Sequence, residues 1–370
     1  MFKATTAYAQ RKLPFGMTSD VLSLMRTQFF DKGYCVSPFP VINPNLAKAI
    51  HKIMPGIYAG KFPSSQYPDE WHYRPTMSLP TITRESCNVW KSDRLVAKVV
   101  LDESIAQLVS DVVGWRSGAR VGQDDLIWKA PLPELENVSG PDFYSGEVAS
   151  STVGFHQDSS YISVNFSPYA NSSVTCWIAL DDSDAQVGAV SYAAGSHKWP
   201  VEMEVSDSSI RKLLPRPPQA KFGGAHESES ESPSSAPSAD ASLAFHSTSS
   251  HLSPLLAASS SLQPPPPPLQ IETPSVPVGH CILHHQDVWH GSGGNLSTTK
   301  SRRAIVVHYL SNEVKFRPTL SKACHSPWRD AGYIYGRYRL LKSDDLLEDF
   351  FPKVCGQRTE WIDKYLNDEE

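Results

Sequence analysis

The fold class is decided by the stretch of residues 280–310, which is HCILHHQDVWHGSGGNLSTTKSRRAIVVHYL. Two apolar runs in it, His280–His284 and Ala304–Leu310, are short and rich in Ile, Leu and Val, and Gly and Asn lie between them, a pattern typical of strands joined by turns. Further short runs of this kind occur at Leu126–Lys129, Ser160–Asn165, Val174–Leu180 and Ala189–Ala193. Short strands separated by Gly, Pro and Asn turns predict a sandwich or jelly roll, not alternating βαβ units.

The first hundred residues have a different pattern, in which apolar residues recur at intervals of three and four. Helices are predicted between Thr18 and Gly33, from Pro44 through Met54, from Ser92 to Leu101 and from Glu103 to Val113. Their apolar stripes are suited to a core. We therefore expect an α+β fold in which a helical N-terminal layer packs on a β jelly roll.

A Ser- and Pro-rich segment interrupts this pattern. Of the 30 prolines, 13 lie between Pro215 and Pro277, and five of them are consecutive at 264–268. Such a composition buries too little apolar surface to offset the entropy of ordering, so we expect residues 219–275 to form a disordered low-complexity loop. The remainder of 20–370 is expected to be a single domain, preceded by a flexible N-terminus at 1–19. A binding site for a proline-recognising partner at 264–268 is the functional alternative to a tolerated surface loop.

Composition excludes several classes of protein. The 370 residues carry a net charge of −5 without a basic half, which argues against nucleic-acid binding. The sequence has no apolar run long enough to span a membrane and no apolar secretory signal, so we expect an intracellular, cytoplasmic protein. The first 19 residues contain Lys3, Arg11 and Lys12 and no acid, so a mitochondrial leader is the alternative. The six cysteines lack C-x-x-C spacing and are expected to be buried thiols.

Two His-Gln-Asp triplets are candidates for metal binding, at 156–158 and 285–287. A single triplet is weak evidence, so a third ligand has to discriminate between them. His290 follows Asp287 at an odd offset, which places it on the opposite face of a straight strand, whereas His156, Asp158 and His290 come from separate strands and can converge. Two histidines and one carboxylate form the facial triad of non-haem Fe(II) oxygenases, which leaves positions for oxygen and a chelating cosubstrate.

A basic residue suited to an anionic cosubstrate follows on the next predicted strand. Alternation places Arg302 on one face with Ala304, and Arg303 on the other. The guanidinium group can donate two parallel hydrogen bonds to a carboxylate, so Arg302 is the predicted clamp. Arg303 stays open as the alternative, because a shift of the register by one residue would exchange the two faces.

These residues, taken together, resemble the phytanoyl-CoA dioxygenase family. The resemblance is carried by the following motifs: His156-Gln157-Asp158, TCWIALDD at 175–182, GAV at 188–190, GSHK at 195–198, WHGSGGN at 289–295 and RRAI at 302–305. It extends from about Phe30 to about Phe351, apart from the Ser/Pro-rich segment.

The resemblance implies a cupin-like double-stranded β-helix that uses Fe(II), 2-oxoglutarate and O2, with ascorbate as reductant. It implies His156, Asp158 and His290 as iron ligands and Arg302 as the partner of the distal 2-oxoglutarate carboxylate. It also suggests that Ser292, Trp177, Gln123 and Lys129 line the cosubstrate site.

The expected reaction is hydroxylation of a C–H bond of a small organic substrate, with decarboxylation of 2-oxoglutarate to succinate and CO2. Halogenating relatives lack the carboxylate ligand, which is present here as Asp158. The alternative from another class is a non-catalytic jelly-roll protein that retains the metal site and acts as a scaffold through the Ser/Pro loop.

Overall fold

The computed structural model describes residues 12–78, 82–131, 152–162, 165–199, 269–317, 335, 338 and 343–367. All of them belong to one compact unit that spans residues 1–214 and 269–370. Residues 1–11 and 219–268, and with them the five consecutive prolines, lie outside the described residues.

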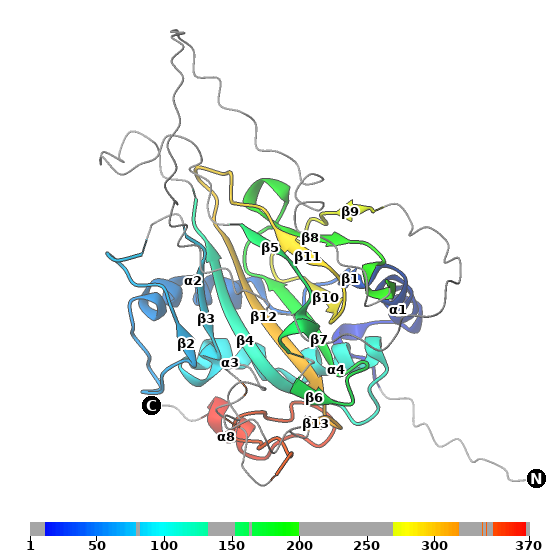
Figure 1. Ribbon diagram of the computed structural model, residues 1–370. Helices are drawn as coiled ribbons and strands as arrows, with labels where there is room; N and C mark the ends of the chain where they lie inside the picture. Colours follow the sequence, from blue (N-terminus) through cyan, green and yellow to red (C-terminus); the bar gives the residue numbers. More distant parts are fainter. Residues whose placement is uncertain are drawn as a thin grey trace, which may run out of the picture. The chain divides into compact units, whose positions relative to one another are not determined.

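The strands of the described residues form two main antiparallel sheets (Figure 1). The larger sheet contains, in spatial order, β1 (Tyr34–Val36), β10 (Cys281–His285), β7 (Ser173–Ala179), β12 (Arg302–Ser311), β4 (Ala119–Lys129), β3 (Arg84–Cys87) and β2 (Glu70–Trp71). The smaller sheet contains, in spatial order, β5 (Val153–His156), β11 (His290–Ser292), β8 (Val190–Ala193) and β9 (Ile271–Glu272). A separate short pair is formed by β6 (Phe166–Ser167) and β13 (Lys315–Phe316).

Helices cover one face of the larger sheet, behind β12 and β4 in the view of Figure 1. The α-helices are α1 (Ser19–Lys32), α2 (Pro44–Tyr58), α3 (Arg94–Val100), α4 (Glu103–Val113) and, near the C-terminus, α8 (Trp361–Asn367). Short 3-10 helices lie at η1 (Pro14–Gly16), η2 (Val89–Lys91), η4 (Asp158–Ser160), η6 (Ala185–Val187) and η7 (Ser196–Lys198). The predicted caps of α1 are present: the Thr18 hydroxyl accepts from the amide of Val21, and Gly33 ends the helix with a φ of 84°.

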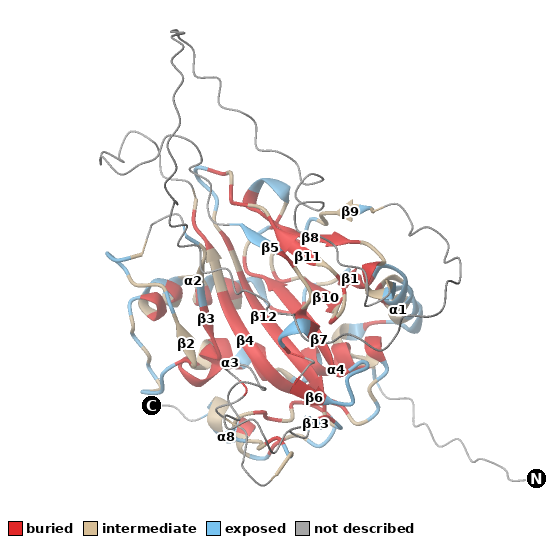
Figure 2. Ribbon diagram, viewed as in Figure 1, coloured by how far each residue is buried: buried red, intermediate tan, exposed pale blue. Residues whose placement is uncertain are grey.

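Alternation along β12 sends its side chains into two different environments. Ile305 and Val307 point toward the helices and are fully buried with Leu108 of α4. Each such apolar side chain contributes roughly 1.5–3 kcal/mol of burial free energy. Ala304 and Val306 face the other way and pack with Trp177 of β7 in a second buried cluster. The candidate site residues lie on that second face; the strands β12, β4 and β7 that carry it are largely buried (Figure 2).

Three predictions of local structure are wrong. Residues 160–165 were expected to form a strand, but Asp158–Ser160 is a 3-10 helix followed by a turn, because the carbonyl of Asp158 accepts from the amide of Ile162 and Asn165 donates to local carbonyls. Residues 219–275 were expected to be a disordered loop, but Ile271–Glu272 is a strand paired with β8. Residues 1–19 were expected to be flexible, but Leu13 and Phe15 pack against the core.

The prediction of buried thiols is confirmed within the described residues. Five cysteines, Cys35, Cys87, Cys176, Cys281 and Cys355, are buried free thiols, and Cys324 lies outside the described residues. No helix in the described ranges is both long and apolar enough to cross a membrane.

Candidate active site

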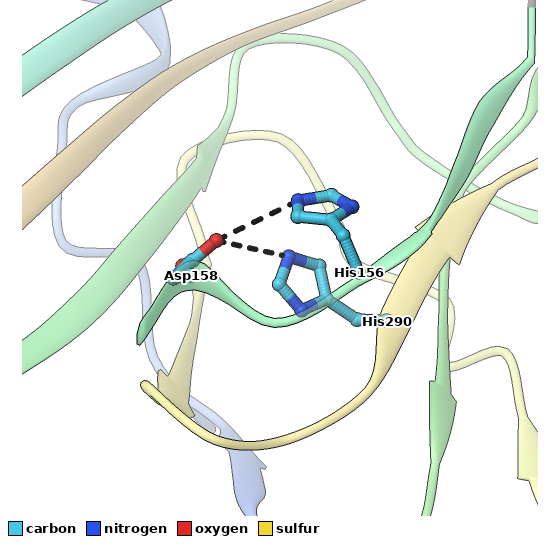
Figure 3. A group of neighbouring side chains, drawn as sticks. All are labelled: His156, Asp158 and His290. Atoms are coloured by element: carbon cyan, nitrogen blue, oxygen red, sulfur yellow. Dashed lines mark ion pairs between the residues drawn. The ribbon is translucent and has the colours of Figure 1, made fainter. Parts of the chain in front are cut away.

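The structure brings His156, Asp158 and His290 together between the two sheets. His156 ends β5, His290 begins β11, and the two residues are partners in the antiparallel pairing of these strands. Asp158 begins η4 directly after β5 and is fully buried. One ligand atom from each residue lies within 4.8 Å of the other two. Both imidazoles turn toward the same carboxylate, as Figure 3 shows.

The orientation of the two imidazoles fits a bound cation. In each ring Nδ1 lies near a backbone carbonyl, of Gly154 at 2.8 Å for His156 and of Val288 at 3.0 Å for His290, which makes Nδ1 the protonated nitrogen. The Nε2 lone pairs then face Oδ1 of Asp158 at 3.6 and 3.5 Å. This arrangement requires positive charge between the three atoms, which a bound metal cation or a proton on Nε2 supplies. The donor set of two imidazoles and a carboxylate therefore fits a divalent transition metal.

Both oxygens of Asp158 accept hydrogen bonds from other side chains. Thr175 donates to Oδ2, and Nε2 of His284 donates to the same oxygen at 3.0 Å. Tyr161 donates to Oδ1 at 2.6 Å. Burial would raise the pKa of Asp158, but the neighbouring imidazoles, His290 foremost, hold it well below its usual range. Asp158 is thus an anion with a fixed orientation.

His308 extends this network to β4. Its Nδ1 donates to the Thr175 hydroxyl at 2.8 Å, because that hydroxyl already gives its proton to Asp158. Its Nε2 donates to Oδ2 of Asp125 at 3.0 Å. Burial alone would lower the pKa of His308, but Asp125 and Asp158 together raise it above its ordinary value. His308 therefore links two buried carboxylates.

The second His-Gln-Asp triplet, at 285–287, is held by packing and by hydrogen bonds to the backbone. His285 packs against Phe29 and His197, and burial lowers its pKa to about 4. Gln286 is buried and accepts hydrogen bonds from the backbone of Ser172 and Ser173. This triplet lies apart from the group formed by His156, Asp158 and His290.

Arg302 lies at the start of β12, on the interior face as predicted. It is 2% exposed, and its Nε donates to the carbonyl of Gly188 at 3.1 Å. Its terminal nitrogens have no partner among the described residues, and the guanidinium lies 5.3 Å from the ring centroid of Trp177. Burial lowers the pKa of Arg302 to about 10. A buried cation with a free donor fork fits a carboxylate ligand.

Lys129 and Ser292 lie beside Arg302. Lys129 is the cross-strand partner of Arg302, and its Nζ donates to Oγ of Ser292 at 2.8 Å and to the carbonyl of Gly293 at 2.6 Å. Burial, followed by the charge of Arg302, lowers the pKa of Lys129 well below its ordinary value. These two adjacent buried basic groups form no ion pair with an acidic side chain in the described ranges, so an anion would stabilise both of them.

Arg303 faces away from this site. It pairs with Asp181 at 3.5 Å at a half-buried position, and its guanidinium lies over the ring of Trp128. Gln123 is on the interior face, but opposite His308 and not beside Arg302; its amide donates to Asp125 at 2.8 Å. Of the residues expected at the cosubstrate site, Trp177, Ser292 and Lys129 therefore surround Arg302, and Gln123 does not.

Sequence reasoning missed several members of the site, namely Thr175, His308 and Asp125. Alternation could have found His308, because it has the same parity as Arg302 on one strand. The others depend on which strands lie next to one another, and a single sequence does not contain that information.

Comparisons with known proteins agree with this geometry. A family model described as Phytanoyl-CoA dioxygenase (PhyH) matches residues 76–304, more than half of the chain, and this segment includes the triad and Arg302. No curated protein matches the chain.

Solved structures share the fold at low sequence identity. The non-heme alpha ketoglutarate dependent epimerase SnoN from nogalamycin biosynthesis superposes with a TM-score of 0.54 and 16% identity, over 91% of this chain and 100% of SnoN. The carbocyclase SnoK, also alpha ketoglutarate dependent and from nogalamycin biosynthesis, gives a TM-score of 0.51 and 15% identity, over 91% of this chain and 96% of SnoK.

Proposed function

The chain belongs to the phytanoyl-CoA dioxygenase family, and from this premise we propose that it is an Fe(II)- and 2-oxoglutarate-dependent dioxygenase that hydroxylates a C–H bond of a small organic substrate. One observation carries the proposal. The site combines three residues that could hold a metal ion, His156, Asp158 and His290, with a buried guanidinium whose donor fork has no partner among the described residues.

The strand order supports a double-stranded β-helix. Along the chain, β4, β7, β10 and β12 belong to one sheet, and β5, β8, β9 and β11 belong to the other. The chain thus passes repeatedly between two facing sheets, as in a jelly roll. We further propose that residues 20–370 form one catalytic domain, which the Ser/Pro-rich insertion interrupts between η7 and β9.

In this proposal His156, Asp158 and His290 hold Fe(II) and leave the remaining coordination positions for 2-oxoglutarate and oxygen. The bound metal and cosubstrate would supply the oxidising chemistry, in which O2 is reduced and 2-oxoglutarate is converted to succinate and CO2. The protein supplies geometry. Gly154 and Val288 orient the imidazoles, while Thr175 and His284 fix the carboxylate.

The second task of the chain is to bind the cosubstrate. Arg302 and Lys129 would bind its distal carboxylate, and Ser292 would contribute its hydroxyl to the same group. The charge-assisted hydrogen bonds to this carboxylate would offset the free-energy cost of burying the guanidinium without a partner. Trp177 is buried beside Arg302 and would exclude water from this end of the site.

The proposal is tested by succinate release from 2-oxoglutarate in the presence of Fe(II), ascorbate and O2. Turnover without a primary substrate is expected to be slow but measurable, and His156→Ala should abolish it. Once a substrate is known, one atom of ¹⁸O from labelled O2 should appear in the product. Binding of Fe(II) without any turnover of 2-oxoglutarate would instead favour the scaffold alternative, and failure to bind Fe(II) would refute both.

A further inference from the structure

The candidate active site opens toward His156. The side chain of His156 is 32% exposed, whereas that of His290 is 8% exposed and that of Asp158 is 1% exposed. On the other side, the ring centroid of His290 lies 4.3 Å from that of His284 and 5.9 Å from that of Tyr192, and both of these neighbours are buried. Solvent therefore approaches the three proposed ligands from the side of His156.

Tyr161 lies at this open side. Its ring centroid is 6.1 Å from that of His156 and 6.4 Å from that of His308, and the residue is 41% exposed. Its hydroxyl points inward and donates to Oδ1 of Asp158 at 2.6 Å. This is the oxygen that faces the Nε2 atoms of both imidazoles. Tyr161 thus extends from the solvent to the carboxylate oxygen that would bind the metal.

The hydrogen bond to Asp158 fixes Tyr161 more than it fixes the carboxylate. Thr175 and His284 already hold the carboxylate through Oδ2. A half-exposed side chain, by contrast, changes rotamer readily in solvent, and a charge-assisted bond to a buried anion removes this freedom. The backbone of Tyr161 is held as well: its amide donates to the carbonyl of Asp158 at 3.2 Å, and its carbonyl accepts from the side chain of Asn165 at 2.6 Å. Both the main chain and the ring of Tyr161 therefore have a defined position at the opening.

We propose that Tyr161 is a positioning residue that covers the open side of the iron site and borders the path of the primary substrate to the metal. This inference rests on the proposed function, because it concerns the same site. Covering the site excludes bulk water from the reacting groups. A tyrosine ring also offers an apolar face, against which the part of the substrate that carries the reacting C–H bond would pack.

The test uses the full chain loaded with Mn(II) in place of Fe(II), together with 2-oxoglutarate. The measurement is the longitudinal NMR relaxation rate of the water protons per bound Mn(II), which rises when more water reaches the metal. Tyr161→Ala removes the ring and should raise this rate about twofold or more, because bulk water then enters from the open side. Tyr161→Phe keeps the ring but removes its hydrogen bond, so its rate should lie between those of the wild type and Tyr161→Ala. Its Mn(II) affinity should stay within a factor of a few of the wild type, since Thr175 and His284 still hold Asp158.

Tyr169→Ala is the matched control and should leave the relaxation rate unchanged, because Tyr169 is 38% exposed and its hydroxyl donates to a different aspartate, Asp287, at 2.8 Å. A rate equal to that of the wild type in either variant of Tyr161 would overturn the inference, and Tyr161→Phe decides it if Tyr161→Ala fails to fold. Loss of Mn(II) binding in Tyr161→Phe would also overturn it, because the hydroxyl would then hold the ligand set and not cover the site. Failure of the wild-type protein to bind Mn(II) or 2-oxoglutarate would instead refute the proposed function, so the two failures are distinguishable.

Discussion

Replacement of Arg302 tests the proposed cosubstrate site most directly. Arg302→Ala removes a guanidinium that is 2% exposed and whose terminal nitrogens have no partner within the described residues. Loss of a charge-assisted bidentate contact at a buried position costs roughly 2–5 kcal/mol, so the affinity for 2-oxoglutarate should fall about 30-fold or more. Fe(II) should still bind, because Arg302 is not among the grouped ligand atoms.

Two further variants separate geometry from charge. Arg302→Lys should recover only part of the loss, because an ammonium cannot reproduce the planar fork. Arg303→Ala removes a half-buried pair with Asp181 on the other face of β12. It should therefore change the 2-oxoglutarate dependence by less than a factor of a few, at a cost in stability of about 1 kcal/mol or less.

The assay is a titration of 2-oxoglutarate against each variant, followed by succinate release and by the visible absorption of the Fe(II)–2-oxoglutarate complex. The absorption measurement reports binding even where turnover is lost. A larger defect in Arg303→Ala than in Arg302→Ala would refute the assignment. It would mean that the interior face of β12 is shifted by one residue, and every interior residue of that strand would have to be reassigned.

Three other predictions follow from the same structure. His156→Ala and Asp158→Ala should abolish Fe(II) binding measured by equilibrium dialysis, whereas His285→Ala should lower it by no more than about 10- to 100-fold; retention by the first two with loss in the third would reverse the ligand assignment. Because the pKa of His285 is lowered to about 4 in the folded protein, its contribution to stability is present above its unfolded value near 6.5 and is lost as the pH falls toward 4. Denaturant unfolding should detect a fall in the free energy of unfolding of up to about 3 kcal/mol between pH 7 and pH 4, and His285→Gln should lack this contribution. An equal fall in the variant would show that His285 is not its cause. Deletion of residues 227–268 should leave the melting temperature and 2-oxoglutarate turnover nearly unchanged, since loop closure costs only about 0.6 kcal/mol per doubling of length; a large fall in melting temperature would show that the segment packs on the core.

The sequence predicted those elements whose signals are local. Thr18 marks the start of α1 and Gly33 marks its end, because a hydroxyl cap and a left-handed glycine act within one helical turn. The strands β7 and β12 were predictable from apolar runs that extend over most of their length. By contrast, β9 has two residues, Ile271 and Glu272, and its place is fixed by contacts with distant residues: Glu272 binds Lys32 and Tyr34 of the N-terminal segment. Local composition cannot contain such contacts.

The same limit explains which parts of the site were predicted. The motif at 156–158 and the face of β12 on which Arg302 lies can each be predicted from the residues of a single strand. The partners of Asp158, which are Thr175 on β7 and His284 on β10, depend on the register between strands.

The pairing of β4 with β12 arranges charge along the site. At one end Lys129 lies opposite Arg302, and six residues along β12, Gln123 lies opposite His308. The pairing is continuous between these positions, and its irregularity comes only after His308. Lys129 and Arg302 therefore face the same interior as Gln123 and His308. Asp125 lies between the two ends, and β3 adds Glu85 beside it. An anionic cosubstrate would therefore be drawn to the end of the site that carries Lys129 and Arg302, and away from the acidic groups further along the strands.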